Sequence, residues 1–230
     1  MKTLVFLVAT LMVTAAGLAQ AEGLRQISVS GSGTVETPPN MALITLGVTS
    51  QDKEAVPALR ETSDAVTRIL NRLTELGIDA RDVQTRDLSL APVWSNKYGA
   101  SGEDAKITGF VSSNRVIVNV RDLSKLGLVL DQVIADGAND FNGLQFSVED
   151  PKPLEDLARA KAVADATDKA QQLAAAAGVK LGAVISISEH GGGGRPMMRM
   201  AAMSEGGSVP IASGEVSVET SVSMVFAIQD

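Results

Sequence analysis

The sequence predicts an α+β fold in which an antiparallel or mixed sheet packs against three main helices. Three segments repeat apolar residues at helical spacing, and several others alternate apolar with polar residues, as strands with one covered face do. Strands with one polar face favour an antiparallel or mixed sheet with helices on the other side. Between residues 41 and 149 the elements follow the order β-α-β-β-α-β, which is the ferredoxin-like split pattern.

The first 21 residues have the pattern of a secretory signal peptide. Lys2 supplies a positive start, Leu4 to Leu18 is almost entirely apolar, and Ala19-Gln20-Ala21 is a small-x-small cleavage site. The apolar run is short for a membrane span. We therefore expect cleavage after Ala21, export from the cytoplasm, and one α+β domain over residues 22–230.

Three helices are expected, over residues 52–76, 123–136 and 151–177. Asp122 and Asp150 stand where N-caps of the second and third helices belong. The third helix is rich in alanine, which favours close packing on its neighbours. Each helix is followed by a glycine suited to the left-handed C′ position and then by an apolar residue, in the pairs Gly77-Ile78, Gly137-Ala138 and Gly178-Val179.

Strands fill most of the remaining sequence. Alternation is clear at 42–48 and 116–120, and weaker strands fit 26–35, 81–93, 143–149 and 179–189. The last strand is the longest, and its apolar face comprises Val216, Val218, Val222, Met224, Phe226 and Ile228. Residues 95–106 form a polar hairpin connection, while the glycine-rich segment Gly191–Gly214 is expected to be a mobile loop.

The last strand bears on assembly. Residues Glu215–Asp230 contain neither proline nor lysine, the residues that commonly protect a sheet edge. If this strand lies at an edge, its free backbone groups invite a partner chain. If it lies inside the sheet, it says nothing about oligomers.

Composition excludes several classes of function. Hydrophobic residues make up 45% and charged residues 20%, as in globular proteins, and the net charge of −7 without a basic cluster argues against nucleic acid or anionic membranes as partners. The chain has no cysteine, which excludes a lipidated cysteine anchor, a thiol nucleophile and a thiolate metal site. The sequence contains no second long apolar run, so we expect no stable insertion into a membrane.

No catalytic constellation stands out. Gly31-Ser32-Gly33 is followed by a strand where a phosphate-binding loop needs a helix, so we expect a bulge or sharp bend there. His190 is the only histidine and lacks a visible serine or cysteine partner, so we expect it to be solvated at a loop start. We therefore expect no enzymatic activity, no catalytic residue and no cofactor; a hydrolase centred on His190 is the weakest alternative.

Two groups of side chains contain atoms of the kinds that bind metals. The acidic pairs Glu149/Asp150 and Glu155/Asp156 lack the spacing of a calcium loop, and helix capping accounts for two of the four. The second group is the methionine cluster, which comprises Met197, Met198, Met200 and Met203. Its thioether sulfur atoms are soft ligands that suit copper(I), and they also react with oxidants. Methionine side chains can equally pack as an adaptable apolar flap, and all three uses stay open.

Several motifs, in order, resemble those of the SIMPL-domain family. The first is Gly31-Ser-Gly33-Thr-Val35, followed by Pro38, Ala42 and Ile44. Next, Gly109-Phe110 leads into Val116–Leu123, and Leu130–Asn139 is followed by Gly143 and Phe146. The last two are Ala160–Ala166 with Ala175–Val179, and Pro210–Val216 with Val222–Phe226. The family usually has Pro-Asp where this chain has Pro39-Asn40, and asparagine closes a turn equally well.

The resemblance implies a periplasmic protein without established catalytic residues, of a type that includes immunogenic and oxidative-stress-defence proteins and large homo-oligomers. From it we expect a non-enzymatic protein that assembles into a homo-oligomer larger than a dimer, in envelope or oxidative-stress protection. The alternative is a periplasmic ligand or copper(I)-binding protein that uses the methionine cluster.

Overall fold

The computed structural model describes residues 25–95, 105–190, 197–199 and 211–229. All three expected helices and all seven expected strands are present, together with one short additional strand. In chain order the elements are β1 (Gln26–Thr37), β2 (Met41–Asp52), α1 (Ala55–Glu75), η1 (Ala80–Asp82), β3 (Val83–Trp94), β4 (Ile107–Val120), η2 (Leu123–Lys125), α2 (Leu126–Ala135), β5 (Asp140–Ser147), α3 (Lys152–Ala177), β6 (Lys180–His190), β7 (Met197–Arg199) and β8 (Glu215–Gln229).

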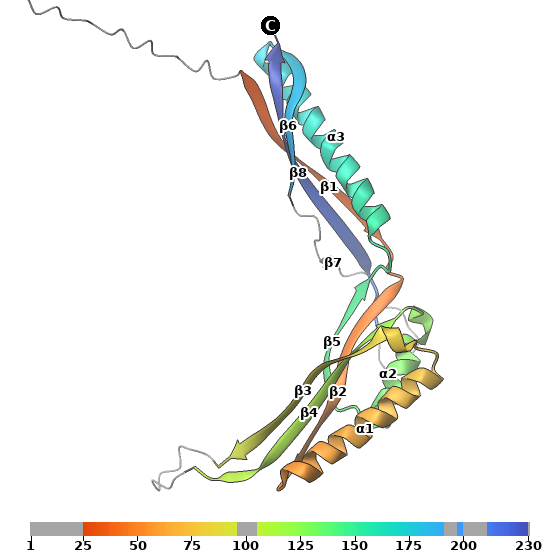
Figure 1. Cartoon of the computed structure of the whole chain (residues 1–230). Coiled ribbons are helices and arrows are strands. Elements are labelled where there is room, and N and C mark those ends of the chain that lie inside the picture. Colours follow the sequence, from red (N-terminus) through yellow and green to blue (C-terminus); the bar gives the residue numbers. More distant parts are fainter. Residues whose placement is uncertain (1–24, 96–104, 191–196, 200–210, 230) are drawn as a thin grey trace, which may run out of the picture.

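The strands form two antiparallel sheets that lie end to end in an elongated, bent molecule (Figure 1). The sheet built from the middle of the chain, here the central sheet, has the order β3-β4-β2-β5. The sheet built from the two ends of the chain, here the terminal sheet, has the order β1-β8-β6, with β7 also paired to β8. The α+β class and the antiparallel pairing are confirmed, although the strands divide between two sheets.

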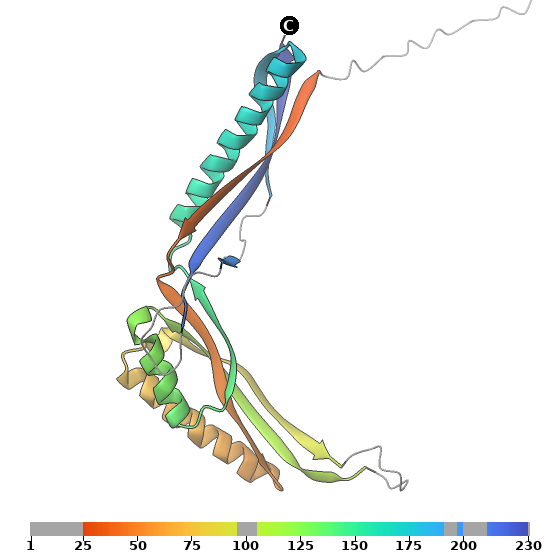
Figure 2. The same ribbon diagram turned by 180° about the vertical axis from the view of Figure 1, so that it is seen from behind.

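The central sheet is the predicted β-α-β-β-α-β unit. Its strand order is the one in which both helices cross the same face, and α1 and α2 lie together on that face in both views (Figure 2). Aliphatic side chains fill the space between, as the low aromatic content requires. The fully buried ones include Ile44, Leu46, Ile69, Leu73, Val116, Val118, Val129 and Val133.

The terminal sheet joins the two ends of the described chain. β1 pairs with β8 along its full length without a register shift, from Gln26 opposite Ala227 to Thr37 opposite Val216. α3 lies along β1 and β8 and contacts β6 much less. The buried face of α3 is a stripe of alanines at every fourth position, namely Ala158, Ala162, Ala166, Ala170 and Ala174.

Helix ends follow the predicted chemistry. Gly77, Gly137 and Gly178 have φ of 82°, 113° and 70°, the left-handed region that glycine adopts without steric cost. After each, the amide of the apolar residue bonds back to a carbonyl five residues earlier, at 2.9–3.0 Å. Asp122 caps the short η2 that leads into α2, where it accepts the amide of Ser124 at 3.1 Å. The N-cap of α3 is Pro151, which has no side-chain cap, although Asp150 beside it accepts the amide of Lys152 at 3.2 Å.

The structure decides between the two placements left open for the last strand. β8 does not lie at an edge, because β1 pairs on one side and β6 and β7 on the other. An uncharged, apolar strand without proline fits the interior of a sheet equally well, so the assembly argument cannot rest on β8. Within the segment expected to be a loop over Gly191–Gly214, Met197–Arg199 form β7, which pairs with Glu215–Ser217 of β8. Residues 191–196 and 200–210 lie outside the described residues, so the mobility of this loop stays a prediction.

Candidate functional site

Among the described residues, nothing resembles a catalytic or cation site. No group of three or more His, Asp or Glu side chains gathers in the described part of the chain. His190 is exposed at the end of β6, as predicted, and its carbonyl accepts a hydrogen bond from Ser221 Oγ at 3.0 Å. In the same regions, no helix is long and apolar enough to cross a membrane.

The acidic pairs have structural partners. Glu149 pairs with Arg121, and Asp150 accepts the amide of Lys152 at the start of α3. Asp156 pairs with Lys152 and Arg159 at 2.8 and 2.7 Å. Glu155 lies in the first turn of α3, where the helix dipole favours a negative charge. The capping explanation therefore fits this region better than a hard-cation site.

The methionine cluster is only partly within the described residues. Met197 and Met198 belong to β7, opposite Ser217 and Val216, whereas Met200 and Met203 lie outside the described residues. The copper(I) alternative therefore stays a prediction. Met224, by contrast, is 3% exposed in the core between β8 and α3, as the alternation of the last strand predicts.

The Gly31-Ser32-Gly33 motif serves close packing, and the predicted bulge or bend is wrong. β1 runs through the motif in unbroken register with β8. A Cβ atom on Gly31 would lie 2.1 Å from the carbonyl oxygen of Ala162, and one on Gly33 would lie 2.0 Å from that of Ala158. Both glycines therefore let the backbone of α3 approach the backbone of β1, which is the other common use of glycine inside a strand.

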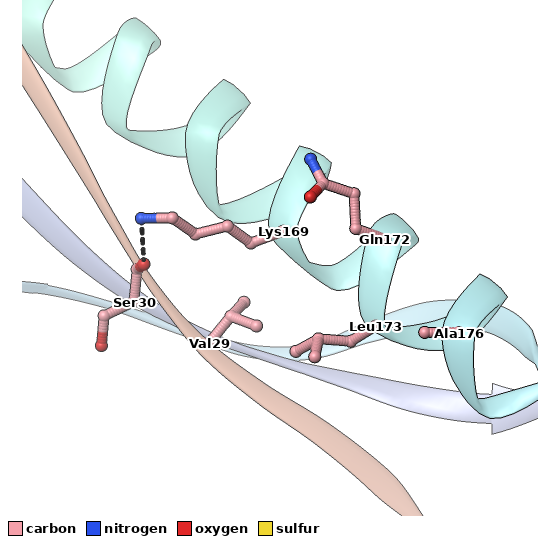
Figure 3. Close-up of a pocket in the computed structure, with 6 residues that line it drawn as sticks. All are labelled: Val29, Ser30, Lys169, Gln172, Leu173 and Ala176. Atoms are coloured by element: carbon pink, nitrogen blue, oxygen red, sulfur yellow. Dashed lines mark hydrogen bonds between the residues drawn. The ribbon is translucent and has the colours of Figure 1, made fainter.

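This close approach lets α3 protect the outer edge of β1. Asp165 Oδ2 accepts the amide of Ser32 at 2.9 Å. Lys161 and Lys169 donate to the carbonyl oxygens of Thr34 and Ser30, at 2.9 and 3.1 Å, and Figure 3 shows the second of these bonds. Three charged side chains at four-residue spacing thus satisfy backbone groups that would otherwise be open to another strand.

An open groove lies beside this protected edge. It has a volume of about 450 Å³ and lies between the first half of β1 and the last turns of α3. The amine of Lys169 is already bonded to Ser30 and Asp165, which leaves a mainly apolar surface without a free reactive group. The lining residues are Val29, Ser30, Lys169, Gln172, Leu173 and Ala176.

Apolar side chains are exposed on two other edge strands. On β6, which α3 hardly covers, Val184, Ile185 and Ile187 are 46%, 47% and 54% exposed. On the β3–β4 hairpin, which extends away from α1 in Figures 1 and 2, the exposed large apolar residues are Leu88, Leu90, Trp94 and Ile107. On β5, the other edge strand of the central sheet, one large apolar residue, Phe141, is also exposed.

A buried ion pair lies where the two sheets meet. Asp82 is 4% exposed and receives two hydrogen bonds from the guanidinium of Arg121, both 2.8 Å long. These bonds hold the pKa of Asp82 below its ordinary value, although desolvation acts the other way. Arg121 also pairs with Glu149, so one guanidinium joins the start of β3 and the end of β4 to the link between β5 and α3.

The turn at Asn40 contributes to the same junction. Its amide donates to the carbonyl of Ser147 at 3.1 Å, and its Oδ1 accepts the amide of Glu149 at 2.8 Å. Both bonds connect the link between β1 and β2 with the link between β5 and α3. A carboxylate at residue 40 offers the same acceptor, so asparagine keeps this structural role.

Comparison with known proteins identifies the family. The model of the SIMPL family, described as proteins of unknown function (DUF541), matches residues 27–226. The chain belongs to the SIMPL family. The predicted resemblance is thus confirmed, and the matched region begins in β1 and ends in β8, so the two sheets together correspond to one SIMPL domain.

Three named relatives support this family assignment. The chain is 35% identical over 212 residues to the 26 kDa periplasmic immunogenic protein of Brucella melitensis, covering 89% of this chain and 85% of that one. The protein of the same name from Brucella abortus gives the same values. The uncharacterized protein YggE of Escherichia coli is 27% identical over 238 residues, covering 100% of this chain and 95% of that one. The names place the Brucella relatives in the periplasm and state no activity.

Proposed function

We propose that this SIMPL protein is exported, loses its signal peptide after Ala21, and acts in the periplasm without catalysis, as a homo-oligomer larger than a dimer. The role that the family resemblance suggests is protection of the envelope or protection against oxidative stress. The names of the Brucella relatives support the compartment. The signal-peptide pattern of residues 1–21 supports the processing.

The observation that most favours assembly is the contrast between the strand edges. The edge of β1 is protected by charged side chains of α3, whereas β6 and the β3 hairpin expose large apolar residues. Scattered apolar residues are normal on a surface, but apolar residues grouped on an edge strand are typical of contact surfaces. Burying them between copies removes apolar area from water at about 25 cal/mol per Å².

Light scattering of the mature chain at micromolar concentration tests the assembly. We expect a mass above that of a dimer. Leu88→Lys combined with Ile187→Lys places charge on both apolar edges, and since both side chains are more than half exposed, the fold should survive. The mass should then fall while the circular dichroism stays the same. An unchanged mass in this variant would show that neither edge takes part.

The methionine cluster supports a second candidate, a copper(I) or other ligand binder. Four of the eight methionines of the chain lie within residues 197–203, and thioethers are ligands that copper(I) prefers. Replacing all four by leucine keeps the apolar volume and removes the sulfur atoms. Copper(I) titration should distinguish the candidates, because binding that this variant abolishes favours the metal role, and absent binding in the parent chain excludes it.

A further inference from the structure

Among the edge strands β1, β3, β5 and β6, β6 has the fewest features that prevent pairing with another chain. The edge of β1 is occupied by the side chains of Lys161, Asp165 and Lys169. β3 contains the charged residues Arg86 and Asp87 and, in its exposed half, Pro92, which has no amide to donate. β5 is the shortest of the four, with eight residues, and it begins at the charged Asp140.

β6 differs from these strands in its sequence. From Leu181 to Ser188 it has no charged residue and no proline. Its three exposed apolar residues, Val184, Ile185 and Ile187, lie within this uncharged run. The run thus combines free backbone groups along one edge with apolar side chains, which is the combination that strand addition requires.

The charges at the two ends of β6 favour a particular partner. Lys180 begins the strand, and Glu189 lies near its end. A second β6 in antiparallel orientation brings the lysine end of each copy to the glutamate end of the other, twice. Parallel pairing would bring like charges together, which is destabilising. Glu189 already accepts from Arg159 at 2.9 Å, and Arg159 also pairs with Asp156, so the incoming lysine would join two carboxylates and one guanidinium.

We propose that β6 pairs in antiparallel orientation with β6 of a second copy of this chain, across a two-fold axis near Ile185. This inference rests on the proposed function, self-assembly, and names one of its contacts. The contact is isologous, because the same strand contributes on both sides, and it joins two terminal sheets into one. The register of β6 on β8 shifts on both sides of Val184. The strand therefore bends there, which limits the length of a regular hydrogen-bonded ladder between the two copies. The apolar side chains and the end charges therefore contribute most of the specificity of the contact.

Cysteine cross-linking tests this arrangement without background, because the chain has no cysteine of its own. Ile185→Cys places a thiol near the proposed axis, where two copies would be close enough for a disulfide. Ser28→Cys is the matched control, since it is exposed on the protected edge of the same sheet. Under mild oxidation we expect the Ile185→Cys chain to form a covalent dimer at least about tenfold faster than the control, because an interface raises the effective thiol concentration to about millimolar.

Orientation is tested by mixing two variants. In an antiparallel pair with its axis at Ile185, residue 183 of one copy lies opposite residue 187 of the other, so Ala183→Cys should cross-link to Ile187→Cys in a mixture, and each variant alone should cross-link poorly. Efficient cross-linking of each alone would indicate parallel pairing and overturn the proposal.

Light scattering of the same reduced samples separates the two levels of the hypothesis. An oligomer whose Ile185→Cys variant cross-links no faster than Ser28→Cys would overturn the β6 contact and leave self-assembly intact. A monomeric parent chain would overturn self-assembly, and this contact with it. Ile185→Lys gives an independent readout, because it should remove the heavier species without altering the circular dichroism.

Discussion

Replacing Gly33 by alanine should destabilise the terminal sheet by forcing α3 away from β1. The added Cβ would lie 2.0 Å from the carbonyl oxygen of Ala158 and 2.6 Å from the amide nitrogen of Ala162. Both atoms belong to the helix backbone, so no side chain can turn aside to make room. Since φ of Gly33 is not in the left-handed region, the cost is steric and not conformational.

The size of the effect follows from the packing. To reach ordinary contact, the helix must move by more than 1 Å over part of its length, which loosens the alanine stripe and the bond between Asp165 and Ser32. Overpacking of this kind costs typically 1–3 kcal/mol, and the rigid neighbour places Gly33→Ala at about 3 kcal/mol. For a chain of this size, that corresponds to a decrease of about 6–12 °C in Tm.

Thermal unfolding followed by circular dichroism measures this change, and Gly127→Ala is the matched control. Gly127 lies in α2 and a Cβ added there meets nothing within 4 Å. Alanine is also the better helix former, so the control should gain up to about 1 kcal/mol. If Gly33→Ala melts within about 2 °C of the parent chain, the close approach of α3 to β1 is wrong.

Three further predictions concern single residues. Asp82→Asn should cost about 1–2 kcal/mol at pH 7, because it removes the charge from the two bonds to Arg121, whose side chain is 34% exposed and keeps its pair with Glu149. Since the folded pKa of Asp82 is lowered, its stabilising contribution is present above the unfolded pKa of about 3.9 and is lost as the pH falls through the folded value. Denaturant titrations should therefore show the two chains converging as the pH falls below about 3.9 and through the folded pKa, and a constant difference would contradict the ion pair. Asp165→Ala should speed hydrogen exchange of the Ser32 amide, measured by NMR, while unchanged exchange would mean that the edge is protected by other groups. Under mild peroxide, mass spectrometry should find Met224 oxidised after the four clustered methionines, Met197, Met198, Met200 and Met203, and the reverse order would contradict the placement of the last strand.

The sequence predicts the local structure well because local structure depends on neighbours in the chain. The helix ends illustrate this, since glycine and the following apolar residue specify both the stop and its hydrogen bonds. The β-α-β-β-α-β order also determines the strand order of the central sheet, because few topologies fit that succession.

Long-range placement could not be predicted in the same way. The composition of β8 fits an edge or an interior strand, and only its pairing with β1 and β6 distinguishes them. Gly31 and Gly33 likewise fit a bend or a close contact. The available signal was the alanine repeat of α3, because small residues on a helix and small residues on a strand at matching spacing suggest close packing. The buried pair of Asp82 and Arg121 leaves no periodic pattern in the sequence.

Self-assembly of the mature chain is tested most directly by sedimentation velocity of residues 22–230 over a range of micromolar concentrations. We expect a species heavier than a dimer, and its loss when Ile185→Lys places a charge on β6. A single species with the mass of one chain at every concentration would contradict assembly, and ligand binding by the methionine cluster would become the leading function.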